Sequence, residues 1–570
     1  MSARVWRPRP PLSRAAVARL VQLNGVFNVI TAVVPAHHGR MAALAPFVPA
    51  AGILSARAAT AAAGALLIHL GAGLRRGRLR AWQLAVVVAG AAIGLHLVKG
   101  LDVAAAVVSA ALLTMLVAVR QEFKALPGPR SRWRAPAALI GFAGAGFLLG
   151  LFEIAVRADH LIGTPGVRAW AEHAALGLIG VTGPVEFARP WAADTVSYTT
   201  GTFGLLAVLA AVVLHLRPGE PRTVRSDDEE QRLRRLLARY GGGDSLGYFA
   251  LRSDKALIWT PSGNAAVAYR VVRGVSLAAG DPIGAESAWP EAIAAWLADG
   301  ERHGWTPAVL GCGRAGAAAY ARAGLDVIEL GDEAVLDVGT FSLDGRAMRS
   351  VRQAVNRIRR AGYTCTAVRQ RDLSATDLAA VVHAADRFRD GTVERGFSMA
   401  LSRLGDPADG DCLMVLAHDE SGELRGVLQF VPWGADGISL DLMRGDRTAP
   451  NGLTELMVVT AVEAGPALGI RRVSLNFAVL RSVFARAEQL GAGPVLRLWH
   501  RLLRLFSRVW QIESLYRANA KYLPMWQPRY LCFPTARDLP RIAVAALTAE
   551  AFLPVRRSAA PVAELALSSC

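Results

Sequence analysis

The sequence predicts a helical membrane domain of about six spans followed by a cytosolic α/β domain, and two observations lead to this prediction. Hydrophobic residues make up 53% of the 570 residues, and the long apolar stretches lie in the first 216. After them, alternating and helical apolar patterns succeed one another, which is typical of α/β folds. The predicted divisions are a multi-span transmembrane domain (1–216), a charged linker helix (217–244), a first α/β module (245–370), a second α/β module with the candidate site (371–540) and a C-terminal tail (541–570).

Six apolar stretches are long enough to cross a bilayer. The first is the weakest because it carries Arg19, Asn24 and Asn28, and a helix on the membrane surface is the alternative for it. A shorter apolar stretch at 174–181 predicts a re-entrant or surface helix. The six stretches are 17–35, 57–75, 81–99, 103–120, 135–156 and 199–216.

Basic residues in the loops predict the orientation of this domain. Arginines and lysines gather before the first stretch, between the second and third (RRGRLR, 75–80) and between the fourth and fifth, whereas the alternate loops contain few. Cytoplasmic loops carry such an excess. We therefore expect a multi-pass protein of the plasma membrane, without a cleaved signal peptide, whose termini and residues 217–570 are cytoplasmic.

The formal net charge of +18 suits a surface that meets an anionic lipid, RNA or both. Charge alone does not separate these partners. The five cysteines show no CxxC spacing and the eleven histidines are scattered, so we expect reduced thiols, no disulfide framework and no metal site.

Two similar successions of strands and helices follow the linker. The first runs from 245 to about 345 and includes an apolar strand, AAVAYRVV (265–272), and a helix, WPEAIAAWLADGERHG (289–304). The second runs from about 372 to 480. Because the pattern repeats, we predict two related α/β modules in tandem.

The second succession ends in a strand–helix–strand unit at 437–480. In the first strand, Asp441 lies on the opposite face from the leucines, and Arg444 follows at the strand's end. Asn451 is the predicted N-cap of the helix, and Glu455 lies in its first turns, where the helix dipole favours a carboxylate.

The second strand of this unit carries Asn476 on its polar face. A connection of this length between two strands implies parallel pairing with a right-handed crossover. We therefore expect Asp441, Glu455 and Asn476 to converge, and we expect the chemistry to take place there.

Two basic helices stand out, at 346–362 and 495–510. In each, arginines share one face and apolar residues the other, so each face is suited to phosphates. A solvated arginine face over a packed core is the alternative, and the second helix also suits the headgroup layer of a membrane. The arginines singled out as substrate-binding candidates are Arg349 and Arg352 in the first helix and Arg497, Arg501 and Arg504 in the second.

Cations and aromatic residues alternate at 520–533. Lys521 and Arg529 lie among Tyr522, Trp526 and Tyr530. Such a mixture is suited to stacking on bases or holding a phosphate. The alternative is the edge of a core from which long cationic side chains reach the solvent.

The region from about 220 to 535 resembles the phosphatidylglycerol lysyltransferases of the multiple-peptide-resistance-factor type, including the actinobacterial lysylphosphatidylglycerol synthetases. The resemblance implies two tandem acetyltransferase-like (GNAT) folds after a multi-span membrane region. It also implies transfer of an aminoacyl group, lysine first of all, from aminoacyl-tRNA to a hydroxyl of phosphatidylglycerol, which lowers the negative surface charge and gives resistance to cationic antimicrobial peptides. The matching stretches are YFALRSDKALIW (248–259), VAYRVVRGVSLAAGDPIG (267–284), VNRIRRAGY (355–363), SLDLMR (439–444), NGLTELM (451–457), VSLNFA (473–478) and NAKYLPMWQPRYL (519–531).

Residue roles follow from the same resemblance. Asp441 and Arg444 match the family's D-x-x-R, and Lys521 with Tyr522 matches its K-Y/F-x-P-x-W element. Two departures are visible. The sequence ends soon after the last motif, without the lysyl-tRNA synthetase module of some actinobacterial relatives, so charging of the tRNA is expected elsewhere. Six spans are also fewer than in relatives that flip the product lipid, which puts flipping in doubt.

An aminoacyl-tRNA is an activated ester, so its transfer needs no cofactor but needs positioning, proton removal and oxyanion stabilisation. Asp441 is one candidate proton acceptor, and a ribose hydroxyl of the tRNA is the other. Arg444 and Lys521 are suited to hold a phosphate or polarise the ester carbonyl, whereas Glu455 and Asn476 are expected to orient neighbours. A structural Asp441–Arg444 ion pair is the alternative.

The sequence leaves rival functions open. An acetyltransferase-like fold is also compatible with transfer from acyl-CoA, although no R/Q-x-x-G-x-G/A signature precedes a helix. A non-catalytic lipid-binding or lipid-translocating protein is the second rival. The transferred amino acid, the acceptor lipid and homo-oligomerisation also stay open.

Overall fold

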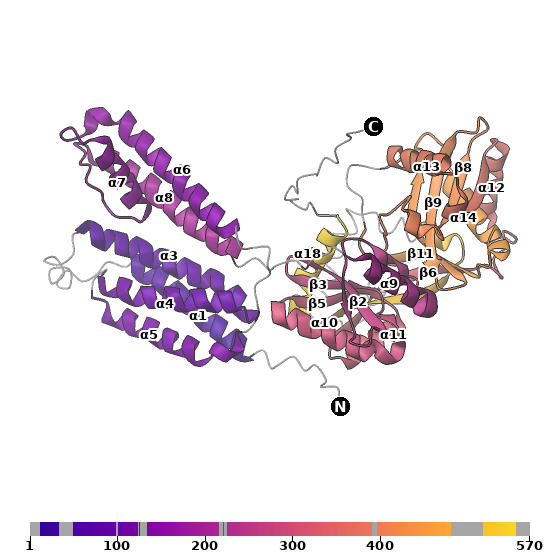
Figure 1. Cartoon of the computed structure of the whole chain (residues 1–570), viewed down its shortest axis with the longest axis horizontal. Coiled ribbons are helices and arrows are strands. Elements are labelled where there is room, and N and C mark those ends of the chain that lie inside the picture. Colours follow the sequence, from indigo (N-terminus) through magenta and orange to yellow (C-terminus); the bar gives the residue numbers. More distant parts are fainter. Residues whose placement is uncertain are drawn as a thin grey trace. The chain divides into compact units, whose positions relative to one another are not determined.

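The structure is a computed structural model that separates into two compact units (Figure 1). One is helical and consists mainly of residues 8–220, and the other is an α/β unit formed mainly by the residues after 220. Each unit has its own hydrophobic core. The structure describes residues 12–33, 50–98, 101–123, 125, 134–215, 221, 225–389, 396–479 and 517–553.

In the helical unit, α1 packs along α3, α3 along α4 and α4 along α5, while α6, α7 and α8 pack on one another. The backbones of α1 and α3 approach closely, because a Cβ on Gly25 would lie 2.6 Å from the carbonyl oxygen of Gly64. Small residues permit such contacts between membrane helices. The described helices are α1 (Leu12–Val33), α3 (Ala50–Arg75), α4 (Leu79–Val98), α5 (Val103–Ala118), α6 (Arg134–Val156), α7 (Val167–Leu178) and α8 (Pro190–His215).

Four helices in the described part of the chain are long and apolar enough to cross a membrane, at Arg14–Ala32, Leu79–Val98, Ala135–Val156 and Pro190–Val212. Four of the six predicted stretches therefore meet the length of a span. The other two also form helices, but their apolar parts are shorter, at Ala59–Arg75 and Val103–Ala118. The apolar stretch at 174–181 largely coincides with the second half of the short helix α7.

In the α/β unit, a capping box starts the first helix, α9, since Ser226 and Glu229 each bond the other's backbone N–H. The helices are α9 (Asp227–Tyr240), α10 (Trp289–His303), α11 (Arg314–Arg322), α12 (Arg349–Arg360), α13 (Ala375–Arg387), α14 (Leu453–Glu463) and α18 (Leu539–Ala549). The strands are β1 (Ala256–Trp259), β2 (Ala265–Val272), β3 (Val275–Ala279), β4 (Ile283–Gly284), β5 (Thr306–Cys312), β6 (Asp326–Asp337), β7 (Thr364–Arg369), β8 (Leu413–His418), β9 (Leu424–Trp433), β10 (Gly437–Gly445), β11 (Arg472–Val479) and β12 (Met525–Phe533).

All these strands join one sheet, in the order β1-β2-β3-β5-β12-β6-β11-β10-β9-β8-β7, with β4 beside β2. The pairs β3–β5 and β10–β11 are parallel, as predicted for the latter, and the other pairs are antiparallel. Strand β12 comes from the predicted second module but lies between β5 and β6, both from the predicted first. The sheet therefore runs without a break across the predicted module boundary.

Helices cover the β7–β11 half of the sheet on both faces. α12 and α14 pack on one face through a core that includes Val355, Met457 and Phe430. α13 packs on the other face through a smaller core around Val381 and Leu442. The loops at the ends of these strands are thereby fixed from both sides, and this is where the candidate site lies.

Candidate active site

The parallel strands β10 and β11 part from each other at the centre of the α/β unit. They pair at only three positions, the last being Ser439 with Ser474, although both strands continue for several residues. Asp441 and Asn476 each lie two residues beyond the last pair. We call this parting of the two strands the fork. Of the three residues predicted to converge, Asp441 and Asn476 lie here, whereas the contact described for Glu455 is with Lys521.

Asn476 ties the two strands together at the fork. Its side-chain nitrogen donates to Leu440 O, and its side-chain oxygen accepts from Ser439 Oγ at 3.4 Å. Its φ of +67° lies in the left-handed region, which asparagine tolerates better than most residues, and the register of β11 against β6 shifts here. The amide thus satisfies a carbonyl that the parting strands leave unpaired.

Asp441 is the extra residue of a β-bulge, since the register of β10 against β9 shifts between Leu440 and Leu442. Both leucines are buried while Asp441 is partly exposed, but Leu440 packs in the core of α12 and α14 and Leu442 in the core of α13. The predicted alternation, with both leucines on one face, therefore ends at the bulge. Asp441 Oδ1 accepts the backbone N–H of Leu401 at 2.6 Å. Bulges often re-aim a side chain next to an active site, and this one aims a carboxylate.

Arg444 is held by α13 rather than by the fork. Its Nη1 donates to Ala385 O at 2.9 Å and lies 3.5 Å from the Asp386 carboxylate, and its side chain is 11% exposed. Asp441 and Arg444 are therefore held by separate partners, which does not favour the alternative of a structural ion pair between them.

Lys521 and Glu455 form an ion pair, with Nζ 2.6 Å from Oε1, and the two side chains are 25% and 19% exposed. The ammonium also lies 5.2 Å from the centre of the Tyr522 ring. The Tyr522 hydroxyl is buried without a hydrogen-bond partner among the described residues, and burial, followed by the charge of Glu455, raises its pKa. Both charges of the pair thus stay within reach of a ligand.

The helix that carries Glu455 begins one residue later than predicted. The N-cap is Gly452, with φ +115° and no side-chain cap, so the prediction of Asn451 as N-cap is wrong. A Cβ at 452 would lie 3.0 Å from Ile358 Cγ1 and 3.2 Å from Ala354 O. Glycine is therefore required by space as well as by φ, because α12 packs against this turn.

Arg529 is buried and does not face a ligand, so the prediction that it binds substrate is not supported. A guanidinium has five N–H donors, and all five are used, by Glu333, Asp244, Ser245 Oγ and Gly311 O. Burial alone would lower the pKa of Arg529, but the carboxylates of Glu333 and Asp244 raise it. The residue holds the β5–β12–β6 region together.

The arginines of the two basic helices have different outcomes. Arg349 is exposed on α12, whereas Arg352 donates to Leu343 O and to Gly345 O, the latter at 3.1 Å, and so fixes the preceding loop. The predicted second basic helix, with Arg497, Arg501 and Arg504, lies outside the described residues.

Two cavities flank the central strands. A cavity of about 110 Å³ lies beside Tyr522, Phe341 and Met348. A larger one, of about 160 Å³, is lined by Asp244, Asp281 and Trp289 and by none of the predicted site residues. Burial and the neighbouring Asp244 raise the pKa of Asp281 to about 7. Within the described residues, no cluster of three or more His, Cys, Asp or Glu is placed to hold a metal ion.

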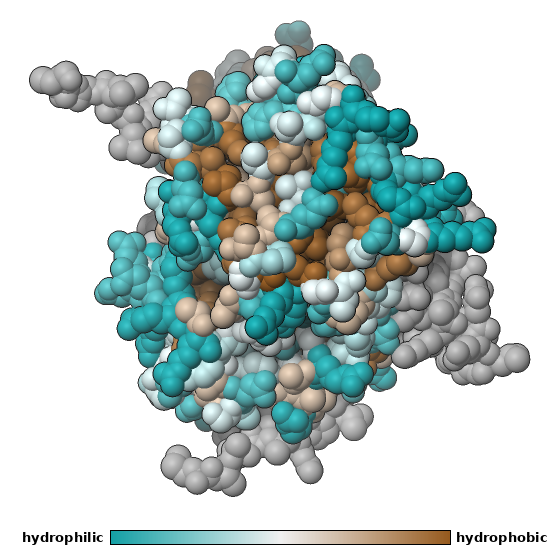
Figure 2. Space-filling view, turned by 90° about the vertical axis from the view of Figure 1, so that its right-hand side faces the viewer, coloured by the Kyte–Doolittle hydropathy of each residue, from teal (hydrophilic) through white to brown (hydrophobic). Residues whose placement is uncertain are grey.

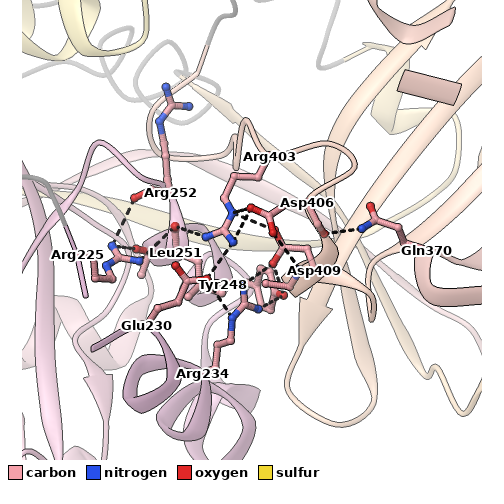
Figure 3. Close-up of polar contacts among 12 residues, drawn as sticks. Arg225, Glu230, Arg234, Tyr248, Leu251, Arg252, Gln370, Arg403, Asp406 and Asp409 are labelled. Atoms are coloured by element: carbon pink, nitrogen blue, oxygen red, sulfur yellow. Dashed lines mark hydrogen bonds and ion pairs between the residues drawn. The ribbon is translucent and has the colours of Figure 1, made fainter. Parts of the chain in front are cut away.

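A buried ion network that the sequence did not indicate joins α9 to the segment 403–409 (Figure 3). Asp409 is fully buried and accepts from Arg234 at 2.7 Å and from the Tyr248 hydroxyl at 2.9 Å. Glu230 accepts from both Arg234 and Arg403. The network anchors the segment that precedes β8, and it is invisible in local patterns because its members lie far apart in the chain.

Comparisons with known proteins identify relatives of this chain. The family model described as "Phosphatidylglycerol lysyltransferase, C-terminal" matches residues 234–533. The chain is 47% identical over 454 residues to the lysylphosphatidylglycerol biosynthesis bifunctional protein LysX of Rhodococcus jostii, covering 80% of this chain and 40% of that one. It is 52% identical over 353 residues to LysX of Mycobacterium avium, covering 62% of this chain and 30% of that one. The chain thus spans less than half the length of these curated relatives.

A solved structure, that of L-PGS from Bacillus licheniformis, aligns with 57% of this chain and 97% of its own. The TM-score is 0.50 and the sequence identity is 24%. This similarity establishes the fold of the α/β unit.

Proposed function

Because the chain belongs to the phosphatidylglycerol lysyltransferase family, whose C-terminal model matches residues 234–533, we propose that it transfers an aminoacyl group, lysine first of all, from aminoacyl-tRNA to a hydroxyl of phosphatidylglycerol. The relatives named for lysylphosphatidylglycerol biosynthesis support lysine and this lipid. The observation that carries the proposal is that the matched region contains the fork with Asp441, together with the Lys521–Glu455 pair.

In the proposed reaction, the oxygen of the lipid hydroxyl attacks the ester carbonyl carbon of the aminoacyl-tRNA. Asp441 accepts the proton of that hydroxyl as the oxygen attacks. A new ester bond forms to the lipid, and the bond to the terminal ribose oxygen breaks, with that oxygen taking up a proton. The bulge supports this role, because it holds a partly exposed carboxylate at the point where the two strands part.

Arg444 and Lys521 supply the positive charge that the reaction needs. We assign to them the oxyanion or a phosphate of either substrate, as fixed positive charges. The carboxylate of Glu455 orients Lys521, and Asn476 and Tyr522 shape the fork around them. No cofactor enters this scheme, since the aminoacyl ester is already activated.

The tRNA approaches along α12 in this proposal. The exposed positions of α12 are polar or basic, and its apolar residues are buried in the core. A helix of this kind has no apolar surface left to insert into a bilayer, so it suits a phosphodiester backbone better than a membrane. Arg357 also donates to Asn451 O at 2.6 Å, which links α12 to the loop before Glu455. Figure 2 shows the end of the molecule near α12, where hydrophilic side chains surround a more hydrophobic area.

We propose the remaining architecture on the same basis. The helical unit crosses the plasma membrane, with six spans in which the two shorter apolar helices also take part, and the α/β unit is cytoplasmic, following the positive-inside pattern of the loops. Two tandem GNAT folds account for the two parallel pairs, β3–β5 and β10–β11, each with a helix between its strands.

The test is aminoacyl transfer by the purified full chain in vesicles that contain phosphatidylglycerol. Radiolabelled lysyl-tRNA, charged beforehand, is added, and label is counted in the organic phase. We expect labelled lipid, no label after treatment of the tRNA with RNase, and no effect of acetyl-CoA. Other charged tRNAs, offered one at a time, define the amino acid. If no charged tRNA labels a lipid and acetyl-CoA acylates an acceptor, the proposal is wrong and the acetyltransferase alternative replaces it.

A further inference from the structure

The backbone segment 396–403 reaches the fork from outside the strand–helix–strand unit. At Leu401 its N–H bonds the Asp441 carboxylate at 2.6 Å. The carbonyl of the same peptide group, Ala400 O, accepts from Arg252 Nη1 at 3.0 Å. Because a peptide group is planar, the orientation of the carbonyl fixes the direction of the N–H. Arg252 and Asp441 therefore hold the two ends of one peptide group.

Arg252 is itself fixed in place. Its Nε lies 2.7 Å from Asp254 Oδ1, and its side chain is 12% exposed. Its Nη1 also donates to Ser402 Oγ at 2.8 Å, so it bonds the residues on both sides of Leu401. Ser402 has φ +56°, a conformation that persists only where its surroundings impose it. In Figure 3 the Arg252 side chain points away from the Asp409 network, so that network does not compete for it.

The start of the segment is anchored independently. The Glu550 carboxylate accepts the N–H of Phe397 at 2.6 Å and the N–H and Oγ of Ser398 at 3.0 and 2.5 Å. The segment is thus held at Glu550 and at Arg252, and Leu401 lies beside the second of these points. Arg403, at the far end of the segment, bonds Leu251 O and Glu230. Arg252 is the side chain that bonds the carbonyl of the Ala400–Leu401 peptide group.

We propose that Arg252 is a positioning residue for Asp441, acting through the Ala400–Leu401 peptide group to aim its N–H at the carboxylate and to favour the ionised form. The inference rests on the proposed function, in which Asp441 accepts a proton. A peptide group whose oxygen accepts from a cation is polarised, and its N–H becomes a stronger donor. Loss of Arg252 therefore weakens this bond and makes Asp441 less acidic.

Other charged groups surround the same segment and enter the pH dependence. Arg444 lies on the same strand as Asp441 and carries a guanidinium. Cys412, before β8, stays neutral because burial and Asp409 raise its pKa. Lys255 lies 4.7 Å from the Phe397 ring, and burial followed by the charge of Arg252 lowers its pKa to about 7. Removal of Arg252 makes Lys255 more basic, and this added positive charge opposes the effect expected on Asp441.

The experiment is the pH profile of single-turnover transfer from lysyl-tRNA to phosphatidylglycerol by the full chain in lipid–detergent micelles. Arg252→Gln should move the acidic limb upward by roughly half a pH unit or more, and Arg252→Lys should restore part of the shift. The matched control is Arg270→Gln. Arg270 pairs with the other oxygen of the same Asp254, at 2.8 Å, and has no contact with the segment in the described structure. Each variant is repeated in a Lys255→Met background, which removes the second titration.

The outcomes separate this inference from the proposed function. If Asp441→Asn retains full transfer, both fail, because Asp441 is then not the proton acceptor. If Asp441→Asn abolishes transfer but Arg252→Gln lowers the rate equally at every pH, or Arg270→Gln shifts the limb as much, only the inference fails. Should Arg252→Gln not fold, Arg252→Met, which also removes the cation, carries the test, and an unshifted limb in that variant overturns the proposal.

Discussion

The sheet has two parallel strand pairs, and in each pair a helix connects the two strands. The pairs differ in how far along the strands the pairing continues. Strands β3 and β5 pair at five positions up to Ala279 with Leu310, and the bond from Gly280 N to Leu310 O at 3.0 Å extends the contact. Strands β10 and β11 stop after three positions and leave the fork. The same strand–helix–strand arrangement therefore gives strands that stay paired in one half of the sheet and strands that part in the other. We call the half with β3 and β5 the closed half and the half with β10 and β11 the open half.

The polar groups differ accordingly. Beside the paired strands β3 and β5, Arg529 is 3% exposed, and all five of its N–H donors form hydrogen bonds within the protein. At the open pair, Asp441 is partly exposed and the Lys521–Glu455 pair remains accessible. Ionisable residues alone thus do not mark a site, since both halves have them. We propose that accessibility at a break in the strand pairing does, and four predictions test this contrast.

The largest expected effect is on stability in the closed half. Arg529→Met leaves the buried carboxylates of Asp244 and Glu333 without their cation, so the free energy of unfolding should fall by about 3–5 kcal/mol. Lys521→Met, in the open half, breaks a partly exposed pair and should cost less than about 1 kcal/mol. Pulse proteolysis in urea of the full chain in detergent measures both. If both variants lost the same unfolding free energy, the proposed difference between a structural role for Arg529 and a ligand-binding role for Lys521 would be wrong.

The second effect is on activity in the open half. Asp441→Asn, Arg444→Ala and Lys521→Ala should each lower aminoacyl-lipid formation about 100-fold or more, the scale of one positioned acid–base or oxyanion group, without unfolding the unit. Asp281→Asn, which changes a carboxylate of the closed half, should retain transfer to within about threefold. Turnover near that of the wild type in the first three variants would move the active site away from the fork.

Sequence patterns were sufficient to predict the strand–helix–strand unit at 437–480, because apolar alternation and the length of a connection are local properties of the chain. They predicted the β10 strand and its parallel partner, but not the bulge at Asp441, which puts Leu442 on the face opposite Leu440. The patterns did not predict the hydrogen-bond partner of Asp441. That partner is the backbone N–H of Leu401, 40 residues away, and a backbone group leaves no signal in the sequence. Arg529 was misassigned for a related reason: its carboxylate partners Asp244 and Glu333 lie 285 and 196 residues away. The catalytic roles stay predictions.

The third effect is a pH dependence confined to the closed half. Burial and Asp244 raise the pKa of Asp281 from its ordinary 3.8 to about 7, so between these values the folded state binds more protons than the unfolded state. Stability from this group is fully present below pH 3.8 and is lost as the pH rises through 7. Asp281→Asn should remove this component from the free energy of unfolding measured between pH 4 and 8. An unchanged slope in Asp281→Asn would show that Asp281 is not the titrating group.

The smallest effect concerns the helices α9 and α12, one in each half. α9 carries four acidic residues and four arginines, whereas α12 carries five arginines and no acidic residue. Only α12 therefore presents a net positive face, and the tRNA is expected there. Arg349→Gln with Arg360→Gln should weaken tRNA binding and lower its salt dependence, the slope of log Kd against log salt, by about one for each arginine that contacts a phosphate. Arg235→Gln with Arg239→Gln, two exposed arginines of α9, is the matched control and should leave the slope unchanged. Fluorescence anisotropy with labelled tRNA over a salt series measures this. If both double variants lost the same tRNA affinity and salt dependence, tRNA binding would depend on the net charge of the protein and not on a site at α12.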